Sequence, residues 1–494
     1  MLKEKDPFPN KAQVLEVKYI STRGEAPVLS FTEALIAGLA SDGGLYVPEN
    51  IPQLSPGEIA GFAGKPYAQV AEAVISPFIA GELEAPALRR MIEAAYAGFR
   101  HQAVTPLSQI GDNLFVLELF HGPTLAFKDV AMQLLGRLMD HVLKARGQRA
   151  TIVGATSGDT GAAAIEAFRG LEQVDVFILY PHQRVSDVQR RQMTTVEGEN
   201  IHVIALEGTF DDAQAILKAL FAHRSFREEF SLSGVNSINW ARVMAQIVYY
   251  FTSAVALGAP HRKISFAVPT GNFGDILAGW FAKRMGLPIE RLVIATNAND
   301  ILARTLTTGI YEIRSVEATQ SPSMDIQVSS NFERLLFEAY GRDAGAIRGL
   351  MANLQQSKSF TIDPAPLAAI RSEFDAASID EAATRAEIAR VWQESAYLAD
   401  PHTAVGIGAA RKVSAPQPET PVVVLGTAHP AKFPDAIAKA TGVKPALPAH
   451  LAGLFERVEQ VDILPNELAA IESFIRAKAG SSAGSSHVAE GVAL

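Results

Sequence analysis

A glycine-rich segment near residue 271 has the residue types that bind an anion. It reads KISFAVPT at 263–270, followed by Gly271, Asn272, Phe273, Gly274 and Asp275, and then a helix-forming stretch. The glycines let the backbone approach an anion, and the start of a helix presents free N–H groups and the positive end of its dipole. A phosphate group would fit such a loop. A tight strand-to-helix turn with Asp275 in the first helical turn explains the same residues at least as well.

A second segment has a similar layout. It reads ATIVGATS at 150–157, then Gly158, Asp159, Thr160 and Gly161, then an alanine-rich helical stretch. Hydroxyls at Thr156, Ser157 and Thr160 add donors that suit a carboxylate or a phosphate. The segment lacks the GK[ST] ending of a nucleotide-binding P-loop and is not a GxGxxG dinucleotide motif. Taken alone, an anion site and a well-capped turn are equally good interpretations.

Lys128 stands at the start of an apolar helical pattern in FHGPTLAFKDVAMQLLGRL at 120–138. A desolvated lysine has a lowered pKa and becomes a nucleophile or a Schiff-base former. For an arbitrary lysine, a side chain that extends to solvent from a helix start is the better explanation.

A third strand end occurs in VVVLGTAHPAKF at 422–433, where Thr427 could present a hydroxyl to a ligand. We expect His429 and Lys432, which follow it, to be solvated or structural rather than catalytic.

The elements that must position these residues follow a recognisable pattern. From about residue 150, short β-branched runs alternate with helix-length segments: ATIVGATS, DVFILYP, IHVIALEG, KISFAVPT, RLVIATNA and PVVVLGT. This alternation predicts an α/β fold with a parallel sheet and helices on its faces. Such sheets bind ligands at the carboxyl ends of their strands, where the glycine-rich turns lie.

The chain divides into regions of different composition. Residues 1–95 are turn-rich and then helical, which predicts a separate N-terminal unit. Residues 96–478 predict a catalytic region of two α/β subdomains, with a mainly helical insertion near 309–400. Residues 479–494 are small and polar, so we expect a disordered tail. The most apolar stretch, at 243–257, is too short to cross a bilayer and predicts a buried helix.

Composition excludes several classes of function. The 494 residues carry a formal net charge of -9, no long basic run and no cysteine. A nucleic-acid or anionic-membrane surface is therefore not expected, and neither thiol chemistry nor thiolate metal sites can occur. We expect no metal site. The N-terminus lacks a signal-peptide pattern, which makes the cytoplasm the expected compartment.

Several longer motifs occur together in one order. They are YISTRGEAPVLSFTEALIAGLASDGGLYVPE at 19–49, HGPTLAFKD at 121–129, GATSGDTGAAA at 154–164, NSINWARV at 236–243, PTGNFGDILAG at 269–279 and GTAHPAKF at 426–433. In these motifs the chain resembles the threonine synthase family over nearly its whole length up to the tail. The resemblance implies the type II fold of pyridoxal-phosphate (PLP) enzymes, related to tryptophan synthase β, with parallel and mixed sheets flanked by helices and a smaller N-terminal domain.

The resemblance also implies roles for individual residues. Lys128 would hold PLP as a Schiff base and act as the catalytic base. Thr427 would hydrogen-bond the pyridine nitrogen. The cofactor phosphate would bind the loop of Gly271, Asn272, Phe273, Gly274 and Asp275, mainly through backbone amides. The substrate α-carboxylate would bind the loop containing Thr156, Ser157, Asp159 and Thr160. Asp159 stands where many relatives have an asparagine near the 3′-oxygen of the cofactor.

The substrate implied is O-phospho-L-homoserine, whose phosphate needs donors inside an acidic protein. Arg242, with Ser237 and Asn239, is our candidate for this role, since residues 239 and 242 share a helix face and arginine offers a planar fork to phosphate. A structural ion pair explains Arg242 equally well.

The activity implied is that of a carbon–oxygen lyase acting on phosphate, which makes L-threonine and phosphate in the last step of threonine biosynthesis. Another type II PLP lyase, such as a threonine or serine dehydratase or a phospholyase, is the nearest alternative. A non-catalytic protein that binds a phosphometabolite is an alternative of another class. We expect a monomer or homodimer with a small-molecule substrate and no nucleic-acid or membrane partner.

Overall fold

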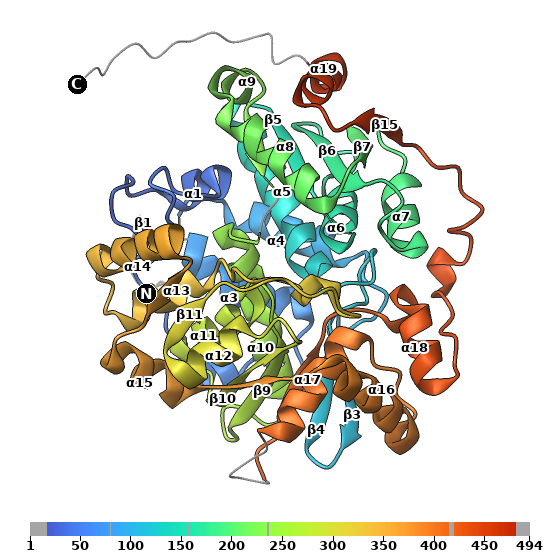
Figure 1. The fold of residues 1–494 in the computed structure, drawn as a ribbon. Helices are drawn as coiled ribbons and strands as arrows, with labels where there is room; N and C mark the ends of the chain where they lie inside the picture. The colour runs from blue at the N-terminus through green and yellow to red at the C-terminus, as the bar shows by residue number, and fades with distance from the viewer. Residues whose placement is uncertain (1–16, 80, 157, 235–236, 414–418, 481–494) are drawn as a thin grey trace, which may run out of the picture.

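The computed structural model describes residues 17–79, 81–156, 158–234, 237–413 and 419–480. Figure 1 shows two main sheets, one in the upper and one in the lower part of the view, with helices α5 and α10 between them. The sequence predicts this α/β fold, and the prediction is confirmed. The 481–494 part of the predicted tail lies outside the described residues, so its expected disorder stays a prediction.

The lower sheet has six strands in the order β13-β10-β9-β14-β4-β3. All neighbours are parallel except β3 and β4, which form an antiparallel pair. The strands are β3 (Leu107–Gly111), β4 (Leu114–Glu118), β9 (Ile264–Pro269), β10 (Ile289–Thr296), β13 (Phe374–Ser378) and β14 (Val422–Gly426). Both faces are covered, so the central strands are apolar throughout, as parallel strands require.

The upper sheet is entirely parallel and has the order β15-β7-β6-β5-β8. Its strands are β5 (Ala150–Ala155), β6 (Val174–Pro181), β7 (Ile201–Glu207), β8 (Leu232–Gly234) and β15 (Asp462–Pro465). β15 comes from the far end of the chain. Figure 1 shows the segment after α18 (Pro434–Thr441) running up one side of the molecule, from the lower part to this sheet.

Helices cover both sheets. Those that follow β4 in the middle of the chain are α5 (Lys128–Arg146), α6 (Asp159–Phe168), α7 (Asp187–Thr194), α8 (Phe210–Ala222), α9 (Arg224–Glu229), α10 (Trp240–Ala256), α11 (Gly274–Arg284) and α12 (Ile301–Thr308). Those near the C-terminus are α16 (Glu381–Ser395), α17 (Pro401–Lys412), α18 and α19 (Leu468–Lys478), with short 3₁₀ turns η2 (Pro430–Lys432) and η3 (Ala449–Leu451). Among the described residues, no helix has both the length and the apolarity needed to cross a membrane.

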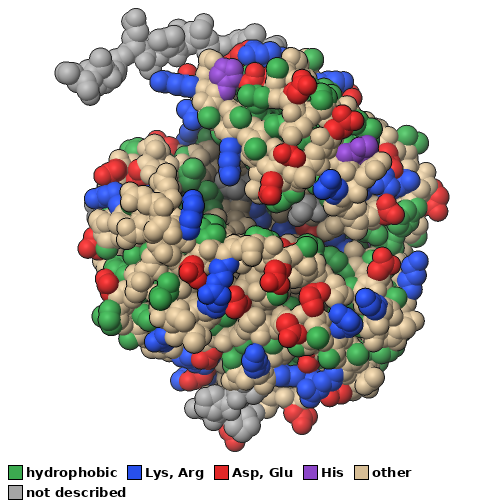
Figure 2. All heavy atoms as spheres, in the orientation of Figure 1, with side chains coloured by type: hydrophobic (Ala, Val, Ile, Leu, Met, Phe, Trp, Pro, Cys, Tyr) green, Lys and Arg blue, Asp and Glu red, His purple; other side chains and the backbone are tan. Residues whose placement is uncertain are grey.

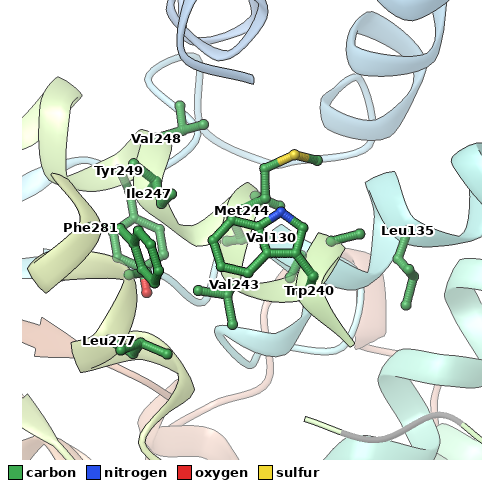
Figure 3. Close-up of a cluster of buried hydrophobic side chains, with 14 of the residues drawn as sticks. Val130, Leu135, Trp240, Val243, Met244, Ile247, Val248, Tyr249, Leu277 and Phe281 are labelled. Carbon is green, nitrogen blue, oxygen red and sulfur yellow. The ribbon is translucent and has the colours of Figure 1, made fainter. Parts of the chain in front are cut away.

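The main core lies around α10. Trp240 is almost completely buried and packs edge-on against Phe281, with ring centroids 4.9 Å apart. Figure 3 shows side chains of α5, α10 and α11 meeting here, among them Val130, Met244 and Leu277. The predicted buried helix at 243–257 corresponds to α10, which ends at Ala256 and packs against both α5 and α11.

The N-terminal elements share this core. They are β1 (Tyr19–Ser21), α1 (Phe31–Ala37), β2 (Tyr46–Pro48), α2 (Pro56–Ala60), α3 (Tyr67–Ile79) and α4 (Ala85–Tyr96). Phe31, Val70 and Phe78 belong to the same buried cluster as Trp240. The described residues of this N-terminal part therefore share the hydrophobic core of α5 and α10.

The segment near 309–400 is mainly helical, although it also supplies β13 to the lower sheet. Besides α16, its other elements are β11 (Ile310–Glu312), η1 (Pro322–Met324), α13 (Phe332–Ala339), α14 (Ala344–Ser357), β12 (Ser359–Thr361) and α15 (Pro364–Glu373). Arg23 of the YISTRG motif forms an ion pair with Glu333 of α13 at 3.0 Å, and the Thr22 hydroxyl donates to the same carboxylate at 2.6 Å. This contact joins the N-terminal segment to the insertion.

Arg334 is a buried junction of three segments. Its guanidinium donates to the carbonyl oxygens of Tyr46 at 2.8 Å and Ile238 at 2.7 Å, and to the Asn331 side chain. We expect Arg334→Met to lower the free energy of unfolding by about 3 kcal/mol, because buried acceptors lose their donor. Chemical denaturation would measure this loss. Arg390→Met, which removes an exposed i,i+4 pair with Glu394, should change stability by less than about 0.5 kcal/mol. Equal losses in the two variants would contradict the prediction.

Candidate active site

Lys128 is the first residue of α5, and its side chain is buried. Its Nζ lies 3.8 Å from Asp159 Oδ2 and 4.7 Å from the centre of the Phe127 ring. Burial lowers the pKa of Lys128, nearby Lys432 and Arg242 lower it further, and the Asp159 carboxylate opposes them. A lysine in such surroundings is a better nucleophile than one in water.

Backbone contacts place Thr427 beside Lys128. Ala126 and Ala428 form an isolated antiparallel bridge, and the Phe127 N–H donates to the Thr427 carbonyl at 2.8 Å. The Thr427 Oγ1 is buried and has no hydrogen-bond partner among the described residues. A buried hydroxyl normally finds a partner, so this atom fits a polar atom of a bound ligand.

The loop from Gly271 to Asp275 follows β9 and leads into α11. Phe273 has a left-handed backbone, with φ 65°, and its ring is buried against Phe332. Such a conformation is strained for a residue other than glycine and persists only where the surroundings fix it. A Cβ on Gly271 would lie 2.7 Å from the Ser323 carbonyl oxygen, so another residue would not fit there.

Asn331 and Ser329 hold this loop from the insertion side. The Asn331 side chain donates to the carbonyl oxygens of Asn272 at 2.9 Å and Ser237 at 3.0 Å, and Ser329 Oγ donates to the Gly271 carbonyl at 2.6 Å. The loop carbonyls are thereby turned toward protein donors. The first N–H groups of an α-helix have no backbone carbonyl partner within the helix, and those of α11 that no side chain occupies are suited to an anion.

Asp275 sits in the first turn of α11 and is buried. Its Oδ1 accepts from the Ile276 N–H at 2.9 Å, and burial raises its pKa to about 6. Part of the Asp275 population is therefore neutral near pH 6, which reduces the repulsion that a bound anion would meet.

The loop after β5 is held by one of its own hydroxyls. Thr156 Oγ1 accepts from the N–H groups of Gly158 and Gly161, both at 3.0 Å. Gly158 has φ 140°, and a Cβ there would lie 2.5 Å from the Gln189 side chain. Thr156 thus shapes the loop through its hydroxyl. Thr160 lies in the first turn of α6, and Ser157 lies outside the described residues.

Asp159 is buried among several donors. Its Oδ1 lies 2.8 Å from Lys432 Nζ and accepts from Gln189 Nε2 at 3.0 Å, and its Oδ2 accepts from Ser323 Oγ at 3.4 Å. Burial alone would raise the pKa of Asp159, but Lys432 and Lys128 hold it well below its usual range. The residue is a carboxylate at neutral pH.

Arg242 is buried on α10, and its Nε has no hydrogen-bond partner among the described residues. Burial lowers the pKa of Arg242 to about 10, so it still carries its charge at neutral pH. Among the ion pairs of the described chain, none involves Arg242, which favours an anion site over a structural ion pair. The charge of Arg242 also contributes to lowering the pKa of Lys128.

Asn239 caps a helix, whereas its spacing from Arg242 suggested contact with the substrate phosphate. Its Oδ1 accepts from the Ala241 N–H at 3.0 Å as the N-cap of α10, and its Nδ2 donates to the Leu35 carbonyl at 2.9 Å. Both polar atoms are engaged within the protein. Asn239 therefore positions the helix that carries Arg242 and ties it to the N-terminal segment.

Lys432 was expected to be solvated or structural. Its exposed fraction is 0%, so it is not solvated, and the structural alternative is the one that remains. The apolar neighbours in AHPAKF were the one available signal of burial. Ser323, Asn331 and Gln189, which also support the site, belong to no motif that we singled out. His429 accepts from the Ala431 N–H at 3.1 Å and caps the η2 turn, in keeping with a structural role.

These residues fit PLP. A buried lysine of lowered pKa suits an aldehyde, a glycine-rich loop at a helix start suits a phosphate, and the unpaired Thr427 hydroxyl suits a ring nitrogen. Figure 2 shows that the molecule is hollowed near the middle of one face, between the parts that carry the two sheets. Among the described residues, no cluster of three or more histidine, aspartate or glutamate side chains could hold a metal ion.

Models of three protein families match the chain. They are "Threonine synthase N terminus" at residues 18–96, "Pyridoxal-phosphate dependent enzyme" at 99–427 and "Threonine synthase, C-terminal" at 403–475. Together they follow the chain from β1 to α19.

Individual relatives match over almost their whole length. The chain is 54% identical to threonine synthase of Pseudomonas aeruginosa over 460 residues, which are 93% of this chain and 98% of the relative. A crystal structure of PLP-bound threonine synthase from Brucella melitensis is 60% identical, with a TM-score of 0.93 and coverage of 94% of this chain and 100% of that one. The crystal structure of the yeast enzyme is 40% identical, with a TM-score of 0.90 and coverage of 95% and 99%.

The resemblance seen in the motifs is thereby confirmed, and PLP is the cofactor. With matches of this identity and extent, the chain belongs to the threonine synthase family of PLP-dependent enzymes.

Proposed function

We propose that this site converts O-phospho-L-homoserine and water to L-threonine and phosphate. The observation that supports this choice of substrate is the buried, charged side chain of Arg242, whose Nε has no hydrogen-bond partner among the described residues. The loop at 271–275 accounts for the phosphate of the cofactor, so Arg242 is a second anion site beside Lys128. A substrate that carries its own phosphate would bind Arg242 while the cofactor phosphate binds the loop.

Each residue of the site has a proposed task in binding. Bound PLP supplies an electron sink for the negative charge that develops at the substrate Cα. The loop N–H groups and Asn272 hold the cofactor phosphate, and Thr427 Oγ1 pairs with the ring nitrogen. The loop carrying Thr160, with Ser157 and Thr156, receives the substrate α-carboxylate, and Arg242 with Ser237 holds the substrate phosphate.

Lys128 carries the proton transfers. Once the Lys128 amine is released from the cofactor, its Nζ removes the proton from the substrate Cα. A lysine of lowered pKa performs this step well near neutral pH. A second proton leaves Cβ and the phosphate departs from Cγ. One proton then returns to Cγ, the hydroxyl of water bonds to Cβ while its proton leaves with the phosphate, and a second proton returns to Cα. Arg242 balances the charge on the departing phosphate. Burial of Lys128 and Asp159 keeps water away from the amine until the step that needs it.

The test is incubation of the PLP-loaded enzyme with O-phospho-L-homoserine, following phosphate and identifying the amino-acid product. Threonine in step with phosphate would support the proposal. Phosphate with 2-oxobutyrate would assign the chain to the phospholyases instead. No reaction despite bound cofactor would reject the substrate and leave the cofactor site in place.

Further proposals concern the compartment, the oligomeric state and the partners of the enzyme. We propose that it works in the cytoplasm as a monomer or homodimer, without a nucleic-acid or membrane partner. The net charge of -9 supports the lack of nucleic-acid binding. Size-exclusion chromatography with light scattering would measure the oligomeric state.

The lowered pKa of Lys128 leads to a prediction on cofactor capture. Only the neutral amine attacks an aldehyde, so PLP-free protein should capture PLP faster as pH rises. Because the folded-state pKa of Lys128 is below the ordinary 10.5, the midpoint of this rise should lie below that of Nα-acetyl-lysine treated in the same way. Stopped-flow absorbance at a series of pH values would measure both midpoints. Equal midpoints would contradict the prediction.

A further inference from the structure

Lys432 is a buried cation that the proposed mechanism does not use. It ends the η2 turn after β14, and its exposed fraction is 0%. Its Nζ lies 2.8 Å from Asp159 Oδ1 and donates to the Thr124 carbonyl at 2.8 Å. A lysine so completely buried needs a paired charge and hydrogen bonds, and Asp159 and Thr124 supply them.

The partner of Lys432 faces the cofactor-binding lysine. One carboxylate oxygen of Asp159 contacts Lys432, and the other lies 3.8 Å from Lys128 Nζ. Gln189 and Ser323 donate to the same carboxylate and fix its direction. Asp159 is therefore a fixed, charged group at the place where the cofactor attaches.

A carboxylate at this place poses an electrostatic problem. PLP carries negative charge on its phosphate and can carry it on its 3′-oxygen. A second buried anion nearby would repel it, whereas a neutral amide would not. The Lys432 ammonium group offsets the charge of Asp159 from the side opposite Lys128.

We propose that Lys432 is a positioning residue that neutralises Asp159, so that the carboxylate can stand beside the bound cofactor as half of a neutral, hydrogen-bonded pair. This inference rests on the PLP site of the proposed function and adds a residue to it. The other ionisable groups near the pair include Lys128, which faces Asp159, and Asp129, whose raised pKa the Lys432 charge partly offsets. Asp275 also acts on Lys128, since its charge raises the pKa of that lysine. Arg242 acts on Lys128 from α10.

The experiment compares Lys432→Met, Asp159→Asn and the double variant as holoenzymes. Each is titrated with acid and base while the absorbance of the bound cofactor is followed, and the dissociation constant of PLP is obtained by dilution. Neither measurement needs a substrate, so failure of the proposed reaction would not affect the result.

The signs of the expected shifts follow from charge. Lys432→Met leaves Asp159 unpaired, which should favour the protonated form of the bound cofactor and raise the titration midpoint by about one pH unit. PLP binding should weaken on the order of 100-fold. Asp159→Asn alone removes the negative charge and should lower the midpoint. The double variant removes both charges, so both quantities should return close to those of the unmodified enzyme.

Controls separate this role from simple support of the fold. Lys439→Met removes an exposed lysine from the next helix and should change neither quantity. If Lys432→Met fails to fold, the downward shift in Asp159→Asn and the recovery in the double variant still test the pair.

Two outcomes would overturn the proposal. The first is an unchanged midpoint in Lys432→Met and Asp159→Asn, which would leave Lys432 a purely structural residue. The second is a shift in Lys432→Met that the double variant does not reverse.

Discussion

Lys128→Ala should lose threonine synthesis by at least about 10⁴-fold, because the substitution removes both the cofactor attachment and the base. Phosphate release from O-phospho-L-homoserine in the presence of excess PLP measures turnover. The absorbance of the protein after gel filtration measures cofactor retention. We expect both to be lost together, since one amine performs both tasks.

The matched control for this change is Lys144→Ala. Lys144 lies on the same helix, is largely exposed and pairs with Glu172 at 2.9 Å, so activity and absorbance should remain. Retained turnover by Lys128→Ala in a cofactor-replete assay would reject the assignment of Lys128.

Arg242→Met should reduce kcat/KM for O-phospho-L-homoserine on the order of 100- to 1,000-fold, because a buried guanidinium can make two charge-assisted bonds to a phosphate. PLP binding should change little, since the proposed cofactor-phosphate loop is elsewhere. Steady-state kinetics and cofactor titration would measure the two effects separately.

Two further variants make the Arg242 test specific. Arg242→Lys keeps the charge but not the planar fork and should recover only part of the loss. Arg90→Met removes an exposed charge from α4 and should leave kcat/KM unchanged. If Arg242→Met lowers stability but leaves kcat/KM intact, Arg242 is a structural residue.

The strands that the sequence predicted share one physical property. β5, β6, β9 and β14 are buried on both faces, so their residues form continuous apolar runs that stand out in the chain. β15 was missed because its residues are mostly exposed, and β13 was missed because FDAAS contains no β-branched residue. Such strands form through pairing with the sheet rather than through their own propensity.

Only those site residues that stand in sequence motifs could be predicted. Lys128, Thr427 and the two glycine-rich loops stand in motifs, and the structure brings them together through Ser323 and the bridge at Ala126. The pairing of Lys432 was not predicted, because its bonding partner Thr124 is 308 positions away. No local pattern reveals a pairing across such a distance. Asn239 is the opposite case. Its spacing from Arg242 suggested a ligand contact, but its side-chain atoms cap α10 and contact Leu35 instead.

The bridge between Ala126 and Ala428 also bears on how the enzyme is made. Lys128 leaves the ribosome early, whereas Thr427 and Lys432 are synthesised only after most of the chain. Domains tend to fold as they emerge, but a contact between distant segments must wait for both. A nascent chain ending before β14 therefore has Lys128, the proposed cofactor lysine, without Thr427 and Lys432. Cofactor loading is consequently a late event in the biogenesis of this enzyme, and ribosome-stalled chains that end before residue 422 should not retain PLP.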